Sequence, residues 1–323
     1  MSPPLAWPMG YLKTYGPRAD PATSLLWGLI ILSLAVVGII TVLAVVGVIV
    51  RRQRGAIDDI AALPVERGAA GLAWFYIGVP LTVVALIGAL AWTVTVLAAV
   101  DSPTVAPRLT IEVTGHQWWW EARYLGHDPG EIFTTANEIH IPTGEPVLIR
   151  LISADVIHSF WIPALSGKTD TIPGQTNIAW LQTDQPGDYL GQCAEYCGLQ
   201  HAHMAIRVMA QAPADFEAWR LGQIQPASSP AGGALTTGQT LFETHCGACH
   251  TVRGTTAGGI VGPDLTHLMS RQTLAAGAVP NDKSGLSGWI ANPQALKPGA
   301  EMPATFLSGQ QLSATVAYLE TLK

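Results

Sequence analysis

The strongest pattern along the chain is a pair of long apolar runs near its start. Residues 24–50 and 68–100 contain no Asp, Glu, Lys or Arg. A helix needs about 20 apolar residues to cross a bilayer, and both runs exceed that length. We therefore predict a transmembrane helical hairpin over residues 24–100, preceded by an extended lead-in at residues 1–23. A helix pair buried in a soluble protein is the alternative, which runs of this length disfavour.

After residue 100 the pattern changes to short β-like runs separated by turn residues. Glycine and proline bound these runs, as in I-P-T-G-E-P and D-Q-P-G-D-Y. Many short strands with such turns predict an all-β antiparallel sandwich or barrel over residues 101–224, closed by a short helix at Pro213–Arg220. The predicted strands are Leu109–Thr114, Glu138–Ile141, Pro146–Ile152, Ile178–Leu181 and Ala205–Met209.

A change of composition separates the last part of the chain from the β-rich part. Residues 225–236 are rich in Pro, Ser and Gly, which is typical of a flexible linker. Residues 237–323 predict an all-α domain that begins with a short helix and ends with an amphipathic helix reaching Leu322. Ser308 and Gln311 match a capping box at the start of that last helix.

Basic residues lie between the two apolar runs. Arg51, Arg52, Arg54 and Arg67 fall in this short segment, and loops rich in Arg and Lys remain in the cytoplasm. Two spans then place the N-terminus and everything after residue 100 on the outer side of the membrane. Residues 101–225 hold six basic and fourteen acidic side chains, which indicates either a basic partner or a solvated surface.

The composition fits a membrane-anchored chain of two or three domains. Of 323 residues, 49% are hydrophobic and 12% are charged, where about 25% charged is usual for soluble proteins. The four cysteines form two close pairs, Cys193 with Cys197 and Cys246 with Cys249. If both pairs serve cofactors, no cysteine remains for a structural disulfide.

The segment from Cys193 to Met204, C-A-E-Y-C-G-L-Q-H-A-H-M, combines thiols, imidazoles and a thioether. Thiolate with imidazole selects copper or zinc, and the thioether favours copper. Two cysteines four apart can bridge two metal ions, with His201 and Met204 as terminal ligands and His158 as the second imidazole. We therefore predict a dinuclear copper electron-transfer site. A structural zinc site and a disulfide are the alternatives, and neither requires the methionine.

The motif C-G-A-C-H has the spacing of covalent haem attachment. Two such cysteines add to the vinyl groups of one haem, and the histidine becomes an axial ligand. We assign these roles to Cys246, Cys249 and His250. A thioredoxin-like redox pair or half of a zinc site is the alternative. Met302, on a proline-rich loop, is the predicted sixth ligand, and Met269 is its competitor.

Together these motifs resemble those of a known family. Residues 24–220 resemble subunit II of the haem–copper cytochrome c oxidases, with G-H-Q-W-W-W, D-V-I-H-S-F-W-I-P, G-K-T-D-T-I-P-G and the copper loop in family order. Residues 237–323 resemble a class I cytochrome c, with C-G-A-C-H, G-P-D-L and P-G-A-E-M-P. This fusion is characteristic of the caa-type oxidases. The resemblance implies a cupredoxin-like fold for residues 101–224.

The resemblance also implies a role for each ligand of a dinuclear copper centre, called CuA. Both cysteines of the loop would bridge the two ions. His158 and Met204 would complete one copper, while His201 and the backbone carbonyl of Glu195 would complete the other. The Glu195 side chain would help bind a Mg or Mn ion shared with subunit I. Trp118, in the aromatic run, matches the electron-entry residue of the family.

Two further comparisons with the family concern acidic residues. Asp155 and Asp170 fall where the family has acidic positions near the docking face for cytochrome c. Many relatives carry a glutamate near the start of the second span, at the mouth of a proton path into subunit I. Here that position is Ala73, and the nearest acid is Glu66. Either Glu66 substitutes or the proton entrance is built differently.

The function that the resemblance implies is electron transfer within an aa3/caa-type cytochrome c oxidase of the bacterial cytoplasmic membrane. Electrons would pass from a cytochrome c donor through haem c and CuA to subunit I, which reduces oxygen to water. No catalytic residue is expected on this chain. The expected partners are oxidase subunits I and III, the donor and membrane lipid, with no nucleic acid. A quinol oxidase subunit is disfavoured, because such subunits typically lack the copper ligands. A copper-containing nitric oxide reductase and a membrane-anchored copper and haem carrier remain as alternatives.

Overall fold

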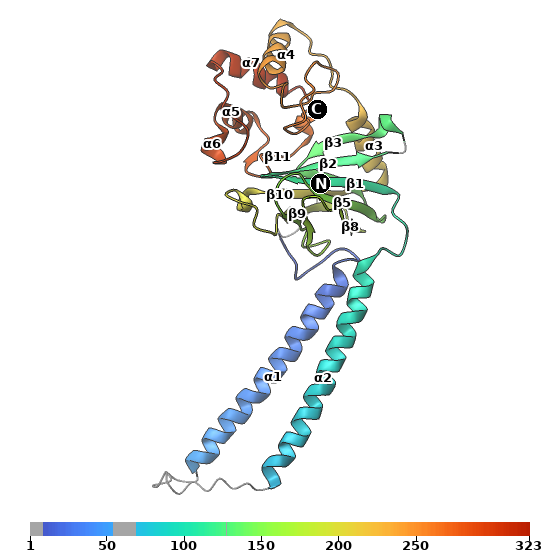
Figure 1. Ribbon diagram of the computed structural model, residues 1–323, viewed down its shortest axis with the longest axis vertical. Coiled ribbons are helices and arrows are strands. Elements are labelled where there is room, and N and C mark those ends of the chain that lie inside the picture. The colour runs from blue at the N-terminus through green and yellow to red at the C-terminus, as the bar shows by residue number, and fades with distance from the viewer. Residues whose placement is uncertain (1–8, 54–68, 127) are drawn as a thin grey trace. The chain divides into compact units, whose positions relative to one another are not determined.

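The computed structural model describes residues 9–53, 69–126 and 128–323 of the chain, which forms two compact units (Figure 1). One unit is the helical hairpin, Pro21–Ser102. The other unit contains the N-terminal segment and Pro103–Lys323, and it holds every motif that carries chemistry. Each unit is described below by itself.

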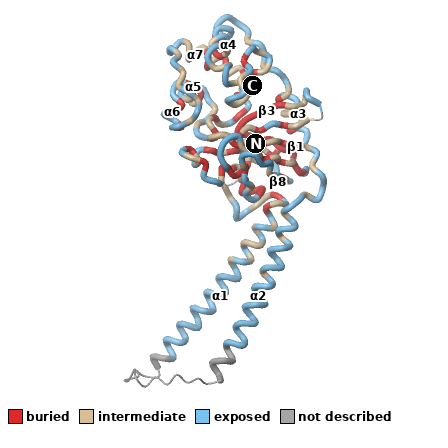
Figure 2. Tube along the Cα trace, in the orientation of Figure 1, coloured by how far each residue is buried: buried red, intermediate tan, exposed pale blue. Residues whose placement is uncertain are grey.

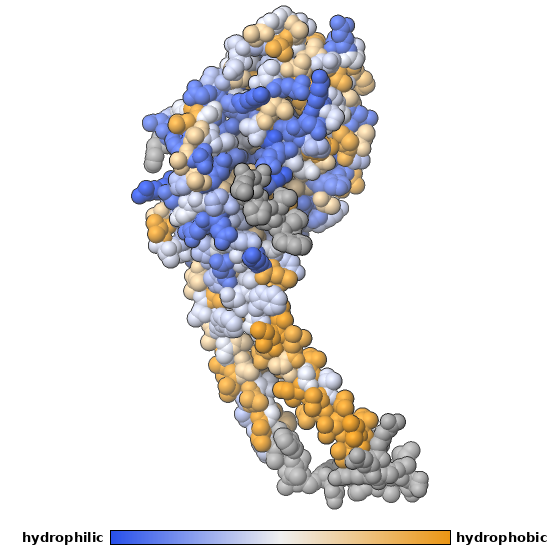
Figure 3. All heavy atoms as spheres, turned by 180° about the vertical axis from the view of Figure 1, so that it is seen from behind, coloured by the Kyte–Doolittle hydropathy of each residue, from blue (hydrophilic) through white to orange (hydrophobic). Residues whose placement is uncertain are grey.

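The hairpin consists of α1 (Asp20–Gln53) and α2 (Ala69–Asp101). Both helices are long and apolar enough to cross a membrane. Hydrophobic side chains gather along their surfaces and are exposed rather than packed into a core (Figures 2 and 3). The helices meet where a Cβ atom on Gly28 would lie 2.3 Å from the ring of Trp92. The prediction of two long apolar helices is confirmed.

The segment that joins the two helices, residues 54–68, lies outside the described residues. The loop predicted to be cytoplasmic from Arg54 and Arg67 falls on this segment, and so does Glu66. The sidedness of the hairpin therefore stays a prediction.

The β domain, residues 109–224, contains a five-stranded sheet in the order β3-β2-β1-β5-β8 and a three-stranded sheet in the order β4-β10-β9. A two-stranded ribbon, β6-β7, lies beside them. The strands of the larger sheet are β1 (Leu109–His116), β2 (Trp119–Leu125), β3 (Phe133–Ala136), β5 (Val147–Ser153) and β8 (Asn177–Leu181). The others are β4 (Glu138–Pro142), β6 (His158–Phe160), β7 (Thr169–Thr171), β9 (Gly187–Gln192) and β10 (Ala205–Gln211).

The sheets are mixed rather than antiparallel throughout. Strand β1 pairs in parallel with β5, with Ile111 opposite Ile149, and β10 pairs in parallel with β4, with Val208 opposite Ile139. The purely antiparallel prediction was therefore wrong in this respect. The chain leaves one sheet and returns to it after forming strands elsewhere, and such a crossover can bring back a parallel strand where a tight hairpin cannot.

Alternating burial along the strands builds the core of the β domain. In β1 every second side chain from Ile111 onward is buried, and in β5 the same alternation begins at Val147. Helix α3 (Pro213–Ile224) covers one edge, as predicted. The N-terminal segment also packs on this domain, because the backbone N–H of Tyr15 donates to Ala164 O at 2.8 Å.

The helical domain, residues 233–323, is built on two packed helices, α4 (Gly233–His245) and α7 (Gly309–Leu319). They can approach closely because Gly238 has no side chain, whereas a Cβ there would lie 2.2 Å from Ala314 O. The capping box of Ser308 and Gln311 is confirmed, although α7 ends at Leu319 rather than at Leu322. The smaller elements are 3₁₀ turns at Pro129–Glu131, His201–His203 and Leu268–Ser270, α5 (Lys283–Ala291), α6 (Pro293–Leu296), β11 (Thr273–Leu274) and β12 (Val279–Pro280).

Candidate copper and haem sites

The first candidate site lies where strand β6 meets the loop that follows β9. His158 opens β6 and is fully buried. Its ring lies against Gly115 near the end of β1, where a Cβ would lie only 2.7 Å from His158 Cδ2. The site therefore requires glycine at position 115, since any larger residue there would displace the imidazole.

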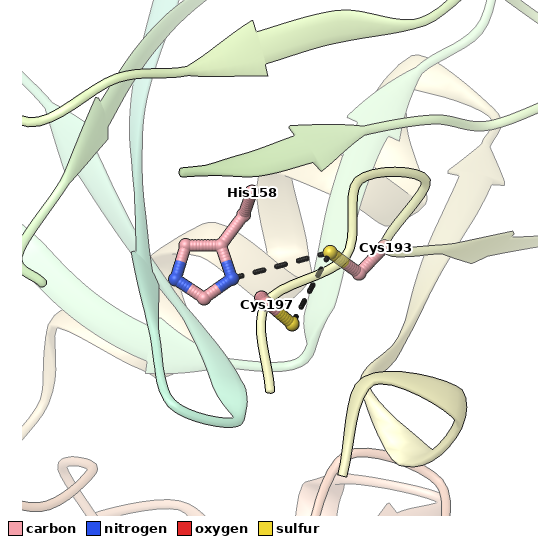
Figure 4. Close-up of side chains that lie close together, drawn as sticks. All are labelled: His158, Cys193 and Cys197. Atoms are coloured by element: carbon pink, nitrogen blue, oxygen red, sulfur yellow. Dashed lines mark hydrogen bonds between the residues drawn. The ribbon is translucent and has the colours of Figure 1, made fainter. Parts of the chain in front are cut away.

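The two cysteines of the loop face each other in the core. Cys193 Sγ and Cys197 Sγ are 3.8 Å apart, and both thiols are buried and unoxidised (Figure 4). His158 Nδ1 lies 3.9 Å from Cys193 Sγ. A disulfide needs about 2.05 Å between the sulfurs, so this spacing argues against the disulfide alternative and leaves room for bridging ions.

The remaining predicted ligands surround the same pair of sulfurs. His201 Nδ1 and Met204 Sδ lie 3.6 and 3.8 Å from Cys197 Sγ. The backbone oxygen of Glu195 lies 3.3 Å from Cys193 Sγ, while the Glu195 side chain points to solvent and is exposed. The structure thus brings all six predicted donor groups together. Two thiolates, two imidazoles, a thioether and a carbonyl fit a pair of copper ions better than a closed four-ligand zinc site.

Electrostatics favour ionised sulfur at this site. The hydrogen bond with Cys197 lowers the pKa of Cys193 to about 3, and the same contact raises the pKa of Cys197. The pair therefore loses its first proton readily and holds the second. Burial opposes protonation of His158, but the hydrogen bonds with Cys193 and Asp155 outweigh it and raise the pKa of the imidazole. A thiolate is the form that binds metal.

Asp155 orients the histidine. His158 Nε2 donates to Asp155 Oδ1 at 2.7 Å, which leaves Nδ1 directed at the sulfurs. The second carboxylate oxygen accepts from the backbone N–H of Gln117 at 2.6 Å. A carboxylate that fixes the outer nitrogen of a ligating histidine is a recurrent feature of metal sites. Sequence reasoning had placed Asp155 only near a docking face, although its position three residues before His158 was a usable signal.

Trp118 and Gln117 both contact the copper loop. The indole Nε1 of Trp118 donates to Cys197 O at 3.0 Å, and Gln117 Nε2 donates to the same oxygen at 2.7 Å. Trp118 is 9% exposed. The predicted entry residue therefore touches the backbone of a predicted copper ligand directly.

The second candidate site is the C-G-A-C-H segment at the end of α4. Cys246 caps that helix, and Cys249 is exposed; both thiols are free. His250 Nδ1 donates to Pro263 O at 2.9 Å, which fixes the ring and leaves Nε2 available. Burial lowers the pKa of His250, so the imidazole is neutral, as an iron ligand must be.

Apolar cavities lie beside His250 and match the needs of a haem. Met302, His250 and Trp289 line both cavities, and Leu265 lines one of them. A Cβ on Gly262 would lie 2.6 Å from the His250 ring, so close packing holds the ring from that side. The predicted competitor, Met269, instead packs against the hydrophobic core of the helical domain.

Two family models match the chain. One is described as cytochrome c oxidase subunit II, periplasmic domain, and matches residues 126–211; the other, cytochrome c, matches residues 235–323. The fold and the two sites thus define a membrane-anchored electron-transfer protein with a cupredoxin-like domain and a cytochrome c domain. The chain belongs to the cytochrome c oxidase subunit II family, and so to a haem–copper oxidase complex.

The relatives cover different shares of the chain. Cytochrome c oxidase subunit 2 of Alkalihalophilus pseudofirmus is 34% identical over 97% of this chain and 90% of its own length. The subunit of Bacillus subtilis is 32% identical over 67% of this chain and 62% of its own length. Among solved structures, the periplasmic domain of oxidase subunit II from Bradyrhizobium japonicum is 30% identical, covers 38% of this chain and 96% of its own, and has a TM-score of 0.35.

Proposed function

We propose that this chain is the electron-entry subunit of a caa-type cytochrome c oxidase, passing electrons from a cytochrome c donor through haem c and CuA to subunit I. Oxygen is reduced to water on that subunit, with proton translocation. The observation that carries the proposal is the joint presence, in one compact unit, of six copper-type donor groups and a haem-attachment motif beside an apolar cavity.

The copper ions would be held between Cys193 and Cys197. The family pattern assigns His158 and Met204 to one ion, and His201 with the Glu195 carbonyl to the other. All four donor atoms lie within 4 Å of one or other sulfur, which supports their role as ligands. When bound, the copper pair supplies one-electron transfer. The chain contributes a preformed set of donors, which limits rearrangement between oxidation states. His158, Cys193, Cys197 and Met204 are buried, so they would keep water from that side of the site.

The haem would be bound through thioether bonds to Cys246 and Cys249, with His250 and Met302 as axial ligands. The His250 ring is oriented before haem binds, because Pro263 O accepts its Nδ1 proton. The apolar lining, which includes Phe242, would exclude water from the iron.

The family and the charge pattern support a proposal for the setting of the chain. We place it in the bacterial cytoplasmic membrane with two spans, and with the N-terminus and both redox domains on the periplasmic or outer side. Subunits I and III and membrane lipid would contact the chain, and the exposed Glu195 carboxylate would bind Mg or Mn together with subunit I. The domain limits proposed are 101–224 for the copper domain and 237–323 for the cytochrome c domain, with a linker at 225–236 whose last four residues already belong to α4.

Purification of the intact complex tests this function. We expect a large haem–copper subunit to be isolated with this chain and the preparation to consume oxygen when a reduced cytochrome c is supplied. Reduction of nitric oxide without oxygen consumption would instead assign the chain to a nitric oxide reductase. A chain isolated alone with copper and haem would be a membrane-anchored carrier.

A further inference from the structure

The β domain and the helical domain share buried charges, the first of which is Glu138. This residue opens β4 and is 2% exposed. Its Oε1 accepts from the backbone N–H of Gln272 at 2.7 Å and of Thr273 at 3.2 Å, both in the helical domain. An unpaired carboxylate away from water is costly, so Glu138 is satisfied in this position only while the helical domain is docked.

The second buried ionisable side chain, Lys297, belongs to the helical domain and contacts the β domain. It follows α6 in the helical domain and is 3% exposed. Its Nζ donates to Trp118 O of the β domain at 2.7 Å and to Ala275 O at 2.9 Å. Burial lowers the pKa of Lys297 to about 7, so these two carbonyls stabilise a strongly desolvated amine. Each domain thus buries one ionisable side chain that the backbone of the other domain satisfies.

The backbones of the two domains also approach closely at two glycines with positive φ. A Cβ on Gly277 (φ +86°) would lie 3.0 Å from the Cβ of Ala205, and one on Gly299 (φ +86°) would lie 3.0 Å from Leu199 Cδ2. The N–H of Ala205 donates to Ala276 O at 3.1 Å. These contacts favour a fixed arrangement, because a side chain at either glycine would be strained at positive φ and would press on its neighbour in the β domain.

Trp118 lies at the centre of this interface and belongs to both sites. Its indole donates to Cys197 O, and its carbonyl accepts from Lys297. It also lines the cavity that contains Cys249 and His250. The position of this one residue therefore depends on the docking of the helical domain.

We propose that Glu138 and Lys297 form an interdomain clamp that holds the helical domain in one docked position, with Trp118 fixed between the copper ligands and the haem cavity. Both are positioning residues. The proposal gives the proposed electron path a fixed geometry, and to that extent rests on the proposed function. It also means that residues 225–236 do not act as the spacer of a swinging domain; Ala227 N–H already donates to Arg253 O at 2.9 Å.

Hydrogen exchange on the purified full-length chain in its complex tests the clamp. Lys297→Met removes the amine at nearly constant volume. We expect it to speed exchange at the amides of Gln272 and Thr273, which Lys297 does not touch, by about tenfold or more. Lys283→Met, on the exposed start of α5 in the same domain, is the matched control and leaves those rates unchanged. Unchanged rates at both amides in Lys297→Met would overturn the proposal.

Exchange in strand β5 reports whether Lys297→Met folds. If it does not fold, a second variant tests the clamp. Glu138→Gln keeps the volume and weakens the acceptor. We expect it to speed exchange at the amide of Ala205, which donates to Ala276 O across the interface at 3.1 Å and is not bonded to Glu138; an unchanged rate there would equally overturn the clamp.

A spectroscopic readout separates the clamp from the proposed function. In Lys297→Met we expect haem c and copper absorbance to be retained and electron transfer between them to slow at least tenfold. A chain that binds neither copper nor haem contradicts the proposed function, and exchange still decides the clamp. A chain with both cofactors and unaltered exchange contradicts the clamp alone.

Discussion

The sulfur of Cys197 has three of the other predicted donors within 4 Å: Cys193 Sγ, His201 Nδ1 and Met204 Sδ. We expect Cys197→Ser to abolish the near-infrared absorbance of the mixed-valence copper pair, because one oxygen cannot replace a bridging thiolate. The haem c spectrum is expected to be unchanged. Tyr196→Phe, at the adjacent exposed position, is the control and should retain the copper band. Absorbance that persists in Cys197→Ser would falsify the bridging assignment.

Asp155 is expected to support the proposed copper site through its hydrogen bond to His158. Replacing it by Asn removes the negative charge that accepts from His158 Nε2. Such outer partners typically contribute about 10–100-fold in metal affinity, so we expect a loss of that size for Asp155→Asn in a copper competition titration. Asp170→Asn serves as the control, since that side chain is exposed on β7. Equal affinities for the two variants would mean that Asp155 does not support the ligand.

Met302 and Met269 can be distinguished at the haem. A thioether ligand raises the potential of a c-type haem, so Met302→Ala should lower the haem midpoint potential and change the visible spectrum. Met269→Leu should leave both unchanged, because Met269 packs against the core of the helical domain. The reverse result would move the axial assignment to Met269.

Among the elements, α7 has the clearest capping contact. Ser308 Oγ accepts from the backbone N–H of Gln311, and the Gln311 side chain accepts from the N–H of Ser308. Ser308→Ala should lower the free energy of unfolding by about 0.5–2 kcal/mol, measured by denaturant titration of the haem-loaded chain. Ser287→Ala within α5 is the control, since its hydroxyl donates only inside its own helix. A smaller loss for Ser308→Ala than for Ser287→Ala would contradict the capping role.

The elements that the sequence predicted are long apolar runs and β-rich runs bounded by turn residues, whereas β2 was missed although its burial alternates. All five predicted strands exist, as do the two apolar helices and α3. Strands β6 and β7 are three residues long and carry no detectable alternation, and β9 is interrupted by glycines. Strand direction was also mispredicted, because alternation records which face is buried but not which strand is the neighbour.

For the sites, the sequence could indicate mainly residues that lie close together along the chain. The predicted copper ligands could be proposed from the sequence because five of the six donors fall within twelve residues, so the loop itself brings them together. The clamp was not recognisable, because Glu138 and Lys297 read in the sequence as ordinary surface charges. Their partners lie 134 and 179 residues away along the chain, and only the docking of two domains buries them.

For the molecule as a whole, Trp118, the predicted entry residue, is covered. Trp118 is 9% exposed, and residues of the helical domain, including Lys297, contact it. Under the proposed function, we therefore expect an external donor to pass electrons to haem c first. We expect the double variant Cys246→Ser, Cys249→Ser, which lacks covalent haem, to retain the copper absorbance but lose most oxygen consumption with reduced cytochrome c.

The control for this variant is Lys283→Met, which changes the surface charge of the same domain but leaves the haem-attachment motif intact. Its oxygen consumption should match that of the wild type. An artificial small-molecule reductant can reach buried sites, so it should restore part of the turnover of the haem-free variant. Wild-type rates with cytochrome c in the absence of covalent haem would show that donors reach Trp118 directly, and the docked helical domain would then not cover the entry face in solution.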